Sequence, residues 1–200
     1  LRFTPYLKAD AYEGDLAVWG VFNGQNTTKL DIPFKNIQGL LQNCRTKELA
    51  WEQPGHWERN TSAQQYDCCY DADRHAIQFD VAWTAPVDKW FYPIYRLDDE
   101  NVPARILGLQ FEVESSQDKV ENDVVCAFVM VGYTTPDHPE PQVVNFAYPP
   151  ALTAWEPRRV LFDHSIPPDA TIRFLRLGCN PCGTRLSFRL RDLRLILPRE

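Results

Sequence analysis

The stretch Leu107-Gly108-Leu109-Gln110-Phe111-Glu112-Val113-Glu114 decides the fold class of this chain. Apolar side chains take every second position, and small or polar residues fill the positions between them. Successive side chains of a β-strand point to opposite faces of a sheet, so this alternation predicts a strand with one face in a core. The stretch Ile77-Gln78-Phe79-Asp80-Val81-Ala82-Trp83 repeats the pattern and predicts a second such strand.

Further strands are predicted on the C-terminal side of these two stretches. Residues 124–133 are apolar on both faces, which is typical of a central strand. Residues 142–148, 159–163 and 171–178 are shorter segments with strand-like composition. These segments make the second half of the chain a run of strands.

The alternation of apolar residues shifts by one position partway along the last strand-like segment. Its apolar positions are Leu186, Phe188 and Leu190, followed by Leu193, Leu195 and Leu197. A β-bulge at Arg191-Asp192 would cause such a shift. The turn residues of segment 178–183 predict a hairpin connection before this strand.

Helical patterns are nearly absent from the sequence. Only residues 36–44 would form a turn or two of helix. The stretch 49–73 is polar and rich in tryptophan and tyrosine, so we expect a long loop there. Strands joined by short connections predict an all-β, two-sheet antiparallel β-sandwich (jelly roll), formed as one soluble domain by residues 1–200.

Composition limits the partners of this domain. With 44% hydrophobic residues the chain can bury a sizeable core. The formal net charge of −6 argues against nucleic acid as a partner, because phosphate binding relies on clustered lysine and arginine. No apolar run approaches the length needed to span a bilayer, so we expect no membrane partner.

Arginines near the C-terminus are a local exception to the acidic composition. They alternate with leucine and phenylalanine, which places them on the side of strands that faces away from the core. They are Arg173, Arg176, Arg185, Arg189, Arg191 and Arg194. Either an ordinary solvated face or a patch for an anionic ligand would explain them.

A succession of motifs over residues 76–197 resembles a known family. The motifs are, in order, the strand ending in Trp83, Asp88-Lys89-Trp90-Phe91-Tyr92-Pro93, Leu107-Gly108-Leu109-Gln110-Phe111-Glu112-Val113, the apolar strand from Val124, Trp155 before Arg159-Val160-Leu161-Phe162, Ile172-Arg173-Phe174-Leu175-Arg176-Leu177-Gly178-Cys179-Asn180, and Leu190-Arg191-Asp192-Leu193-Arg194-Leu195. This order resembles the galactose-binding-like β-jelly-roll carbohydrate-binding modules appended to bacterial glycoside hydrolases.

The resemblance implies non-catalytic binding of a plant or algal polysaccharide of the glucan, xylan or mannan type. The partners would be that polysaccharide and a catalytic glycoside hydrolase domain in the same parent chain, which the module targets to substrate. It further implies a bacterial protein that is secreted or held at the cell surface. Two alternatives stay open: a structural accessory sandwich that packs on a neighbouring catalytic domain, or a small glycosidase or lyase that uses Glu112 and Glu114.

Aromatic rings and polar strand residues are the expected ligand contacts. A ring face stacks on the C–H face of a pyranose, and polar side chains then bind the hydroxyl groups. Aromatic residues that flank polar or loop segments are Trp51, Trp57, Trp90, Tyr92, Tyr95 and Tyr148. Polar residues expected to face away from the core are Gln110, Glu112, Asn145, Arg173 and Arg189.

The resemblance also implies one structural Ca²⁺ that joins the first strand to the last. Calcium takes six to eight oxygen ligands, mixing carboxylates with backbone carbonyls. The sequence offers Asp10, Glu13 and Asp15 near its start and Asp192 at the predicted bulge. A salt bridge of Asp192 with a neighbouring arginine is the alternative explanation for this last residue.

Overall fold

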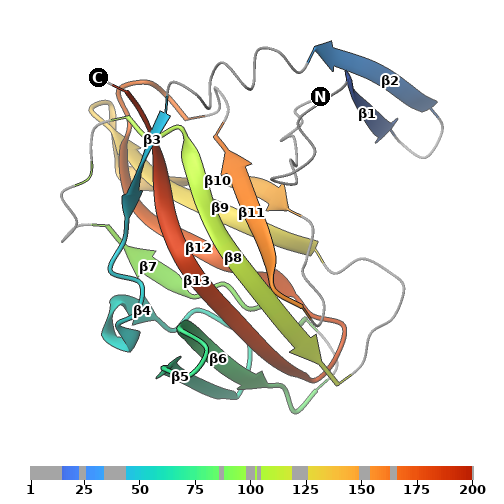
Figure 1. Ribbon diagram of the computed structural model, residues 1–200, viewed down its shortest axis with the longest axis vertical. Helices are drawn as coiled ribbons and strands as arrows, with labels where there is room; N and C mark the ends of the chain where they lie inside the picture. The colour runs from blue at the N-terminus through green and yellow to red at the C-terminus, as the bar shows by residue number, and fades with distance from the viewer. Residues whose placement is uncertain are drawn as a thin grey trace.

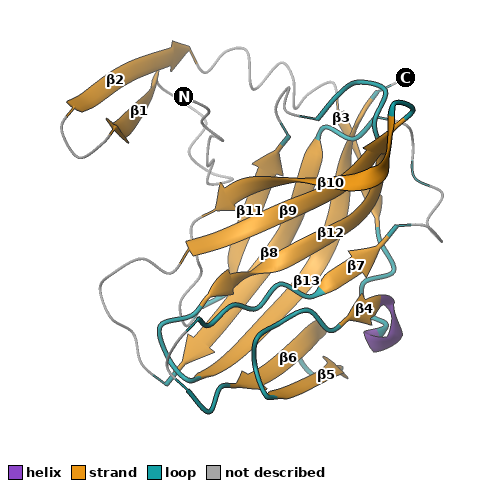
Figure 2. Ribbon diagram, turned by 180° about the vertical axis from the view of Figure 1, so that it is seen from behind, coloured by secondary structure: helices purple, strands orange, loops and turns teal. Residues whose placement is uncertain are grey.

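A computed structural model describes residues 15–22, 26–33, 44–85, 88–97, 102, 105–118, 126–148, 154–162 and 166–199. Two antiparallel β-sheets lie face to face, as Figures 1 and 2 show from opposite sides. The predicted two-sheet antiparallel sandwich is therefore confirmed. That residues 1–200 form a single domain stays a prediction, because parts of the chain lie outside the described residues.

The first sheet has five strands in the order β10-β9-β12-β7-β4. They are β10 (His138–Tyr148), β9 (Cys126–Thr135), β12 (Thr171–Asn180), β7 (Ile94–Arg96) and β4 (Trp57–Glu58). In Figure 2 this sheet faces the viewer. The predicted central strand is β9, which lies between β10 and β12.

The second sheet has six strands in the order β11-β8-β13-β6-β5, with β3 also paired to β13. They are β11 (Glu156–Leu161), β8 (Gly108–Gln117), β13 (Arg185–Pro198), β6 (Ala76–Ala82), β5 (Gln65–Asp71) and β3 (Cys44–Glu48). The long strand β13 pairs with β6 through residues 185–190 and with β3 through residues 194–198.

The remaining elements lie in the first third of the chain. β1 (Asp15–Phe22) and β2 (Asn26–Pro33) form a two-stranded antiparallel sheet. Residues Pro54–His56 form η1, a single 3₁₀ turn. No helix of the described residues is long and apolar enough to cross a membrane.

Period-two alternation builds the core between the two large sheets. In β8 the side chains of Leu109, Phe111 and Val113 are buried, whereas Gln110 and Glu112 are only partly buried. The ring of Phe111 meets that of Tyr148 from the other sheet edge-on, with 5.3 Å between the centroids. The sandwich is thus held together by side chains that the alternating pattern predicted to face inward.

The predicted bulge in the last strand is also confirmed. The register of β13 against β8 shifts between Arg191 and Arg194, and Asp192 has a φ of 52°. The shift lets Leu190 and Leu193 both face the core, where each is fully buried. The left-handed conformation of Asp192 therefore lets the apolar residues of both halves of β13 face the core.

Two predictions about connections are wrong. Segment 178–183 is not a hairpin, because β12 and β13 belong to different sheets and the chain crosses from one to the other. The stretch 49–73 is not one long loop, since it holds η1, β4 and the edge strand β5. Of the predicted helical turn, residues 36–43 lie outside the described residues, and Cys44 begins β3.

Candidate functional site

The outer face of the five-stranded sheet, turned away from the core, is broader than its short strands suggest. Isolated bridges join Phe91 to Cys179 on one side and to Thr61 on the other. They continue the register in which β7 pairs with β12 and with β4. Residues 91–96 and 57–61 therefore extend the sheet beside β12 (Figure 2).

Cross-strand pairing arranges the outward side chains in three rows, which we call the platform. One row is Asn145, Met130, Arg176, Ile94 and Glu58; the next is Ala147, Phe128, Gly178, Tyr92 and Asn60; the third is Val143, Gly132, Phe174 and Arg96. With neighbouring strands about 4.8 Å apart, a five-residue row spans about 19 Å. That is the length of a short oligosaccharide.

Phe174 fills the centre of the third row. A Cβ atom on Gly132 would lie only 2.2 Å from Cζ of Phe174, so the ring rests on the backbone of β9 where that glycine leaves room. The guanidinium of Arg176 lies 4.8 Å from the ring centroid and that of Arg96 lies 5.7 Å from it. Phe174 is consequently 6% exposed, and the surface above it is formed by arginine.

The two arginines differ in their partners. Arg96 donates from Nε to Oε1 of Glu58 at 2.7 Å and from Nη2 to Oε2 at 3.1 Å. This pairing holds the pKa of Glu58 below its ordinary value. Nε of Arg176 is buried and has no hydrogen-bond partner among the described residues. Burial lowers the pKa of Arg176, and the neighbouring charge of Arg96 lowers it further.

Tyr92 anchors the second row. Its hydroxyl donates to Oδ1 of Asn180 at 2.7 Å, and its ring centroid lies 6.3 Å from that of Phe128. Asn60 donates from Nδ2 to the carbonyl of Tyr92 at 2.7 Å. Tyr92 is thus fixed from two sides and is buried, with only 4% of its surface exposed.

The accessible part of the platform mixes apolar and polar groups. Phe128, Met130 and Ile94 are half-buried, and Val143 is 46% exposed. Asn145 and Arg96 are exposed beside them. Apolar surface with a few placed polar groups is the composition of a ligand site.

Most of the predicted aromatic contacts lie in the core instead. Trp51, Trp57, Tyr95 and Tyr148 are all at most 5% exposed. The rings of Trp57 and Tyr95 pack edge-on at 5.1 Å, and the hydroxyl of Tyr148 donates to the carbonyl of Gly178. All four side chains belong to the hydrophobic core cluster between the sheets, which places them outside the platform.

The other predicted contacts divide between surfaces. Tyr92 and Asn145 belong to the platform, and the exposed Arg173 donates from Nε to Oγ1 of Thr134 near it. Trp90 is half-buried in the segment before β7. Gln110, Glu112 and Arg189 do face away from the core, but on the six-stranded sheet. The predicted set is therefore not one site.

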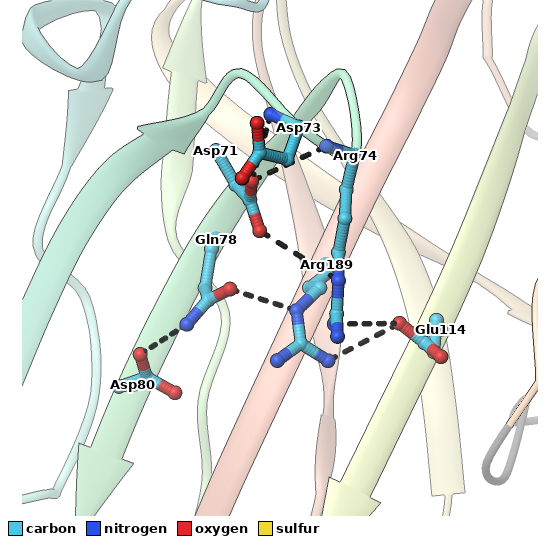
Figure 3. Close-up of polar contacts among 7 residues, drawn as sticks. All are labelled: Asp71, Asp73, Arg74, Gln78, Asp80, Glu114 and Arg189. Carbon is cyan, nitrogen blue, oxygen red and sulfur yellow. Dashed lines mark hydrogen bonds and ion pairs between the residues drawn. The ribbon is translucent and has the colours of Figure 1, made fainter.

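Ion pairs cover the outer face of the six-stranded sheet. Arg189 donates to Oε1 of Gln78 at 2.8 Å and to Oε2 of Glu114 at 3.1 Å, and Arg74 lies 3.7 Å from the same carboxylate (Figure 3). Arg191 pairs with Glu112 at 2.6 Å. Directly opposed charges on neighbouring strands explain this ladder as a solvated sheet face.

A groove of about 590 Å³ lies at one end of that ladder. Asp67, Asp80, Asp118 and Arg185 contribute to its lining. Asp118 accepts hydrogen bonds from the backbone N–H of Arg185 and the hydroxyl of Thr184. Part of the lining therefore holds the β12–β13 connection in place.

The described residues do not by themselves make up a calcium cage. They contain no cluster of three or more acidic, histidine or cysteine side chains that could hold a metal ion. Asp192 is at the bulge, but its Oδ1 lies 3.5 Å from Nη2 of Arg194. Asp10 and Glu13 lie outside the described residues, and Asp15 begins β1. The calcium ion stays a prediction.

Chelation tests that prediction. If Ca²⁺ binds the folded chain, its removal by EDTA should lower the melting temperature, because the unfolded chain has no preformed site. Adding Ca²⁺ in excess should restore the melting temperature, whereas Mg²⁺ should not, because it tolerates irregular oxygen cages poorly. Identical melting curves in EDTA and in Ca²⁺ would remove the ion from the proposal.

Comparison with sequences identifies no relative. No family model matches the chain, and no curated protein matches it.

Comparison with solved structures finds carbohydrate-binding modules. The family 11 module of a cellulosomal cellulase of Clostridium thermocellum matches with a TM-score of 0.52 and 15% identity, over 78% of this chain and 96% of the module. A family 29 module in complex with mannohexaose matches with a TM-score of 0.50 and 9% identity, over 78% of this chain and 94% of that one. These values show that the chain shares the β-sandwich fold of carbohydrate-binding modules.

A third match joins such a module to an enzyme. It is the N-terminal part of xylanase 10B of Clostridium thermocellum, a family 22 module with its family 10 catalytic module, in complex with xylohexaose. The TM-score is 0.50 at 9% identity, over 75% of this chain and 27% of that one. The resemblance predicted from the strand order is therefore confirmed for the fold.

Several platform residues escaped the sequence-based prediction. Phe128, Met130, Ile94 and Glu58 come from three strands that are far apart in the sequence. Arg176 did carry a signal, since it lies between the apolar residues Leu175 and Leu177 and was grouped with the outward arginines. The alternation indicates that such a residue faces outward, but not which sheet carries it.

Proposed function

We propose that this chain binds a polysaccharide without catalysis, on the platform, and that it targets an attached glycoside hydrolase to its substrate. A plant or algal β-linked glucan, xylan or mannan is the class of ligand. The proposal includes a secreted or cell-surface location and a catalytic domain in the same parent chain. Its main support is the outer face of the five-stranded sheet, where the half-buried apolar side chains of Met130 and Ile94 alternate with polar groups along the row from Asn145 to Glu58, which is about 19 Å long.

The fold of the chain supports the same class of function. A module with this fold is known in complex with mannohexaose, and a protein that joins another such module to a family 10 glycoside hydrolase module is known in complex with xylohexaose. Fold alone does not decide function, so the proposal rests on the side chains of the platform.

One observation favours the accessory-domain alternative. The three rows of the platform carry no tryptophan, and Trp51 and Trp57 are used in the core. The half-buried apolar side chains of the platform could equally meet a neighbouring domain. Retention on glycans decides between the two functions.

The glycosidase alternative has less support. Glycosidases place two carboxylates on opposite sides of the bond that is cleaved. Glu112 and Glu114 lie on the same face of one strand, and each is paired with an arginine of β13. Release of reducing ends by the chain, abolished by Glu112→Gln, would be needed to restore this function.

Affinity electrophoresis tests glycan binding on the platform. We expect retardation in gels that contain a soluble β-glucan, xylan or mannan, and a roughly fivefold to tenfold weaker affinity for Phe128→Ala, because a central aromatic contact is commonly worth over 1 kcal/mol. Trp155→Ala is the matched control, since this half-buried ring stacks with Arg191 on the opposite sheet. No retardation on any glycan would contradict the proposal, and loss only in Trp155→Ala would move the site to the other face.

A further inference from the structure

We propose, resting on the function proposed above, that the platform prefers an acidic glycan and that Arg176 binds the carboxylate of a uronic acid residue. The position of this arginine carries the inference. It stands in the first row of the platform, which lies between the other two rows, with Met130 on one side and Ile94 on the other. A ligand lying along that row would pass directly over its guanidinium.

Arg176 is a charge without compensation among the described residues. Its buried Nε has no hydrogen-bond partner, and no described carboxylate forms an ion pair with it. The one acidic residue of the platform, Glu58, is already held by Arg96 through two hydrogen bonds. The platform is therefore positively charged on a chain whose formal net charge is −6.

The surroundings of Arg176 make this charge costly in the free protein. Phe174 lies beneath it, and its cross-strand neighbours Met130 and Ile94 offer no acceptor. A cation that is partly removed from water and unpaired is unfavourable, so an arriving anion relieves that cost. Burial lowers the pKa of Arg176 and the positive charge of Arg96 lowers it further, so both disfavour the charged form of the guanidinium.

The chemistry of the guanidinium selects the kind of anion. Its planar fork matches the two oxygens of a carboxylate and can form two parallel hydrogen bonds. The position of Arg176 over the ring of Phe174, with Cζ 4.8 Å from the ring centroid, keeps that fork on the platform. Half-buried Phe128 and Met130 beside it supply an apolar surface for the C–H face of a sugar ring. A sugar with a carboxylate offers an anion to the guanidinium and a C–H face to the apolar surface, whereas a neutral sugar offers only the C–H face.

Polymers that differ only in their carboxyl groups test this inference. Affinity is measured for glucuronic-acid-substituted xylan and for polygalacturonate, each before and after chemical reduction of its carboxyl groups to alcohols. We expect tighter binding of at least one acidic polymer than of its reduced form, and weakening of that binding by added salt. Arg176→Gln should lose roughly tenfold to a hundredfold in affinity for the acidic polymer and little for the reduced one.

Two variants control for charge and geometry. Arg74→Gln removes the same charge from the turn between β5 and β6, where Arg74 pairs with Glu114 of the six-stranded sheet, and should leave binding unchanged. Arg176→Lys keeps the charge but loses the fork, so it should bind with intermediate affinity. Unfolding curves check that each variant is folded.

The outcomes separate this inference from the proposed function. Equal binding of each acidic polymer and its reduced form, with no effect of Arg176→Gln, overturns the acidic preference and leaves glycan binding in place. Absence of binding to every acidic and neutral glycan overturns both. Equal losses in Arg74→Gln and Arg176→Gln would show an effect of net charge alone and would also overturn the role of Arg176.

Discussion

Phe79→Ala is expected to lower the free energy of unfolding by about 3 to 5 kcal/mol, the usual cost of truncating a buried phenylalanine. Phe79 is completely buried. The centroid of its ring lies 5.3 Å from that of Trp57 and 5.4 Å from that of Phe91, and both of these residues belong to the opposite sheet. Because Phe91 in turn meets Phe188 of β13 at 5.4 Å, the cavity would open between the two sheets. Urea denaturation followed by circular dichroism measures the loss.

Val143→Ala is the control for this measurement. Val143 lies on the outer face of β10 and is nearly half exposed. Its truncation should change the free energy of unfolding by less than about 0.5 kcal/mol. A loss below about 1 kcal/mol for Phe79→Ala would mean that the two sheets are not joined through this aromatic cluster.

Strands in which apolar and polar residues alternate regularly could be predicted from sequence, because one face of each strand lies in the core. In β8 and β13 the alternating apolar residues are leucine, phenylalanine and valine, which are rarely found in loops at this spacing. The edge strand β5 was missed although it alternates too. Its inward residues are Tyr66, Cys68 and Tyr70, only partly buried, and they do not form an aliphatic pattern. An edge strand has one neighbour, so its sequence is less constrained.

The candidate site was less predictable than the fold for a different reason. A row of the platform, such as Met130, Arg176 and Ile94, is formed by pairing between strands and not by spacing along the chain. Aromatic content predicted sugar contacts, but Trp57 and Tyr95 are used to pack the core. Likewise, segment 178–183 has the residues of a hairpin turn and instead changes sheets. Local sequence specifies a turn but does not specify the sheet that follows it.

Gly178→Ala is expected to cost about 3 to 5 kcal/mol of stability, from overpacking together with strained hydrogen bonds. A Cβ atom at this position would lie 1.8 Å from the carbonyl oxygen of Phe91, and 2.8 Å from its carbonyl carbon. Both are backbone atoms, so no side-chain rotation relieves the contact. The hydrogen bonds that Phe91 and Cys179 exchange, at 2.9 and 3.0 Å, would have to lengthen. Chemical denaturation of the variant measures the loss.

The same substitution should also weaken glycan binding, because residues 91–96 carry Tyr92, Ile94 and Arg96 onto the platform beside β12. Binding is therefore measured without denaturant, at a temperature at which the variant is still folded. Gly55→Ala is the matched control, since a Cβ atom there would meet no atom within 4 Å and should change neither stability nor binding. If Gly178→Ala were as stable as the parent chain, the close approach of residues 91–96 to β12 would be refuted, and with it the register that forms the rows of the platform.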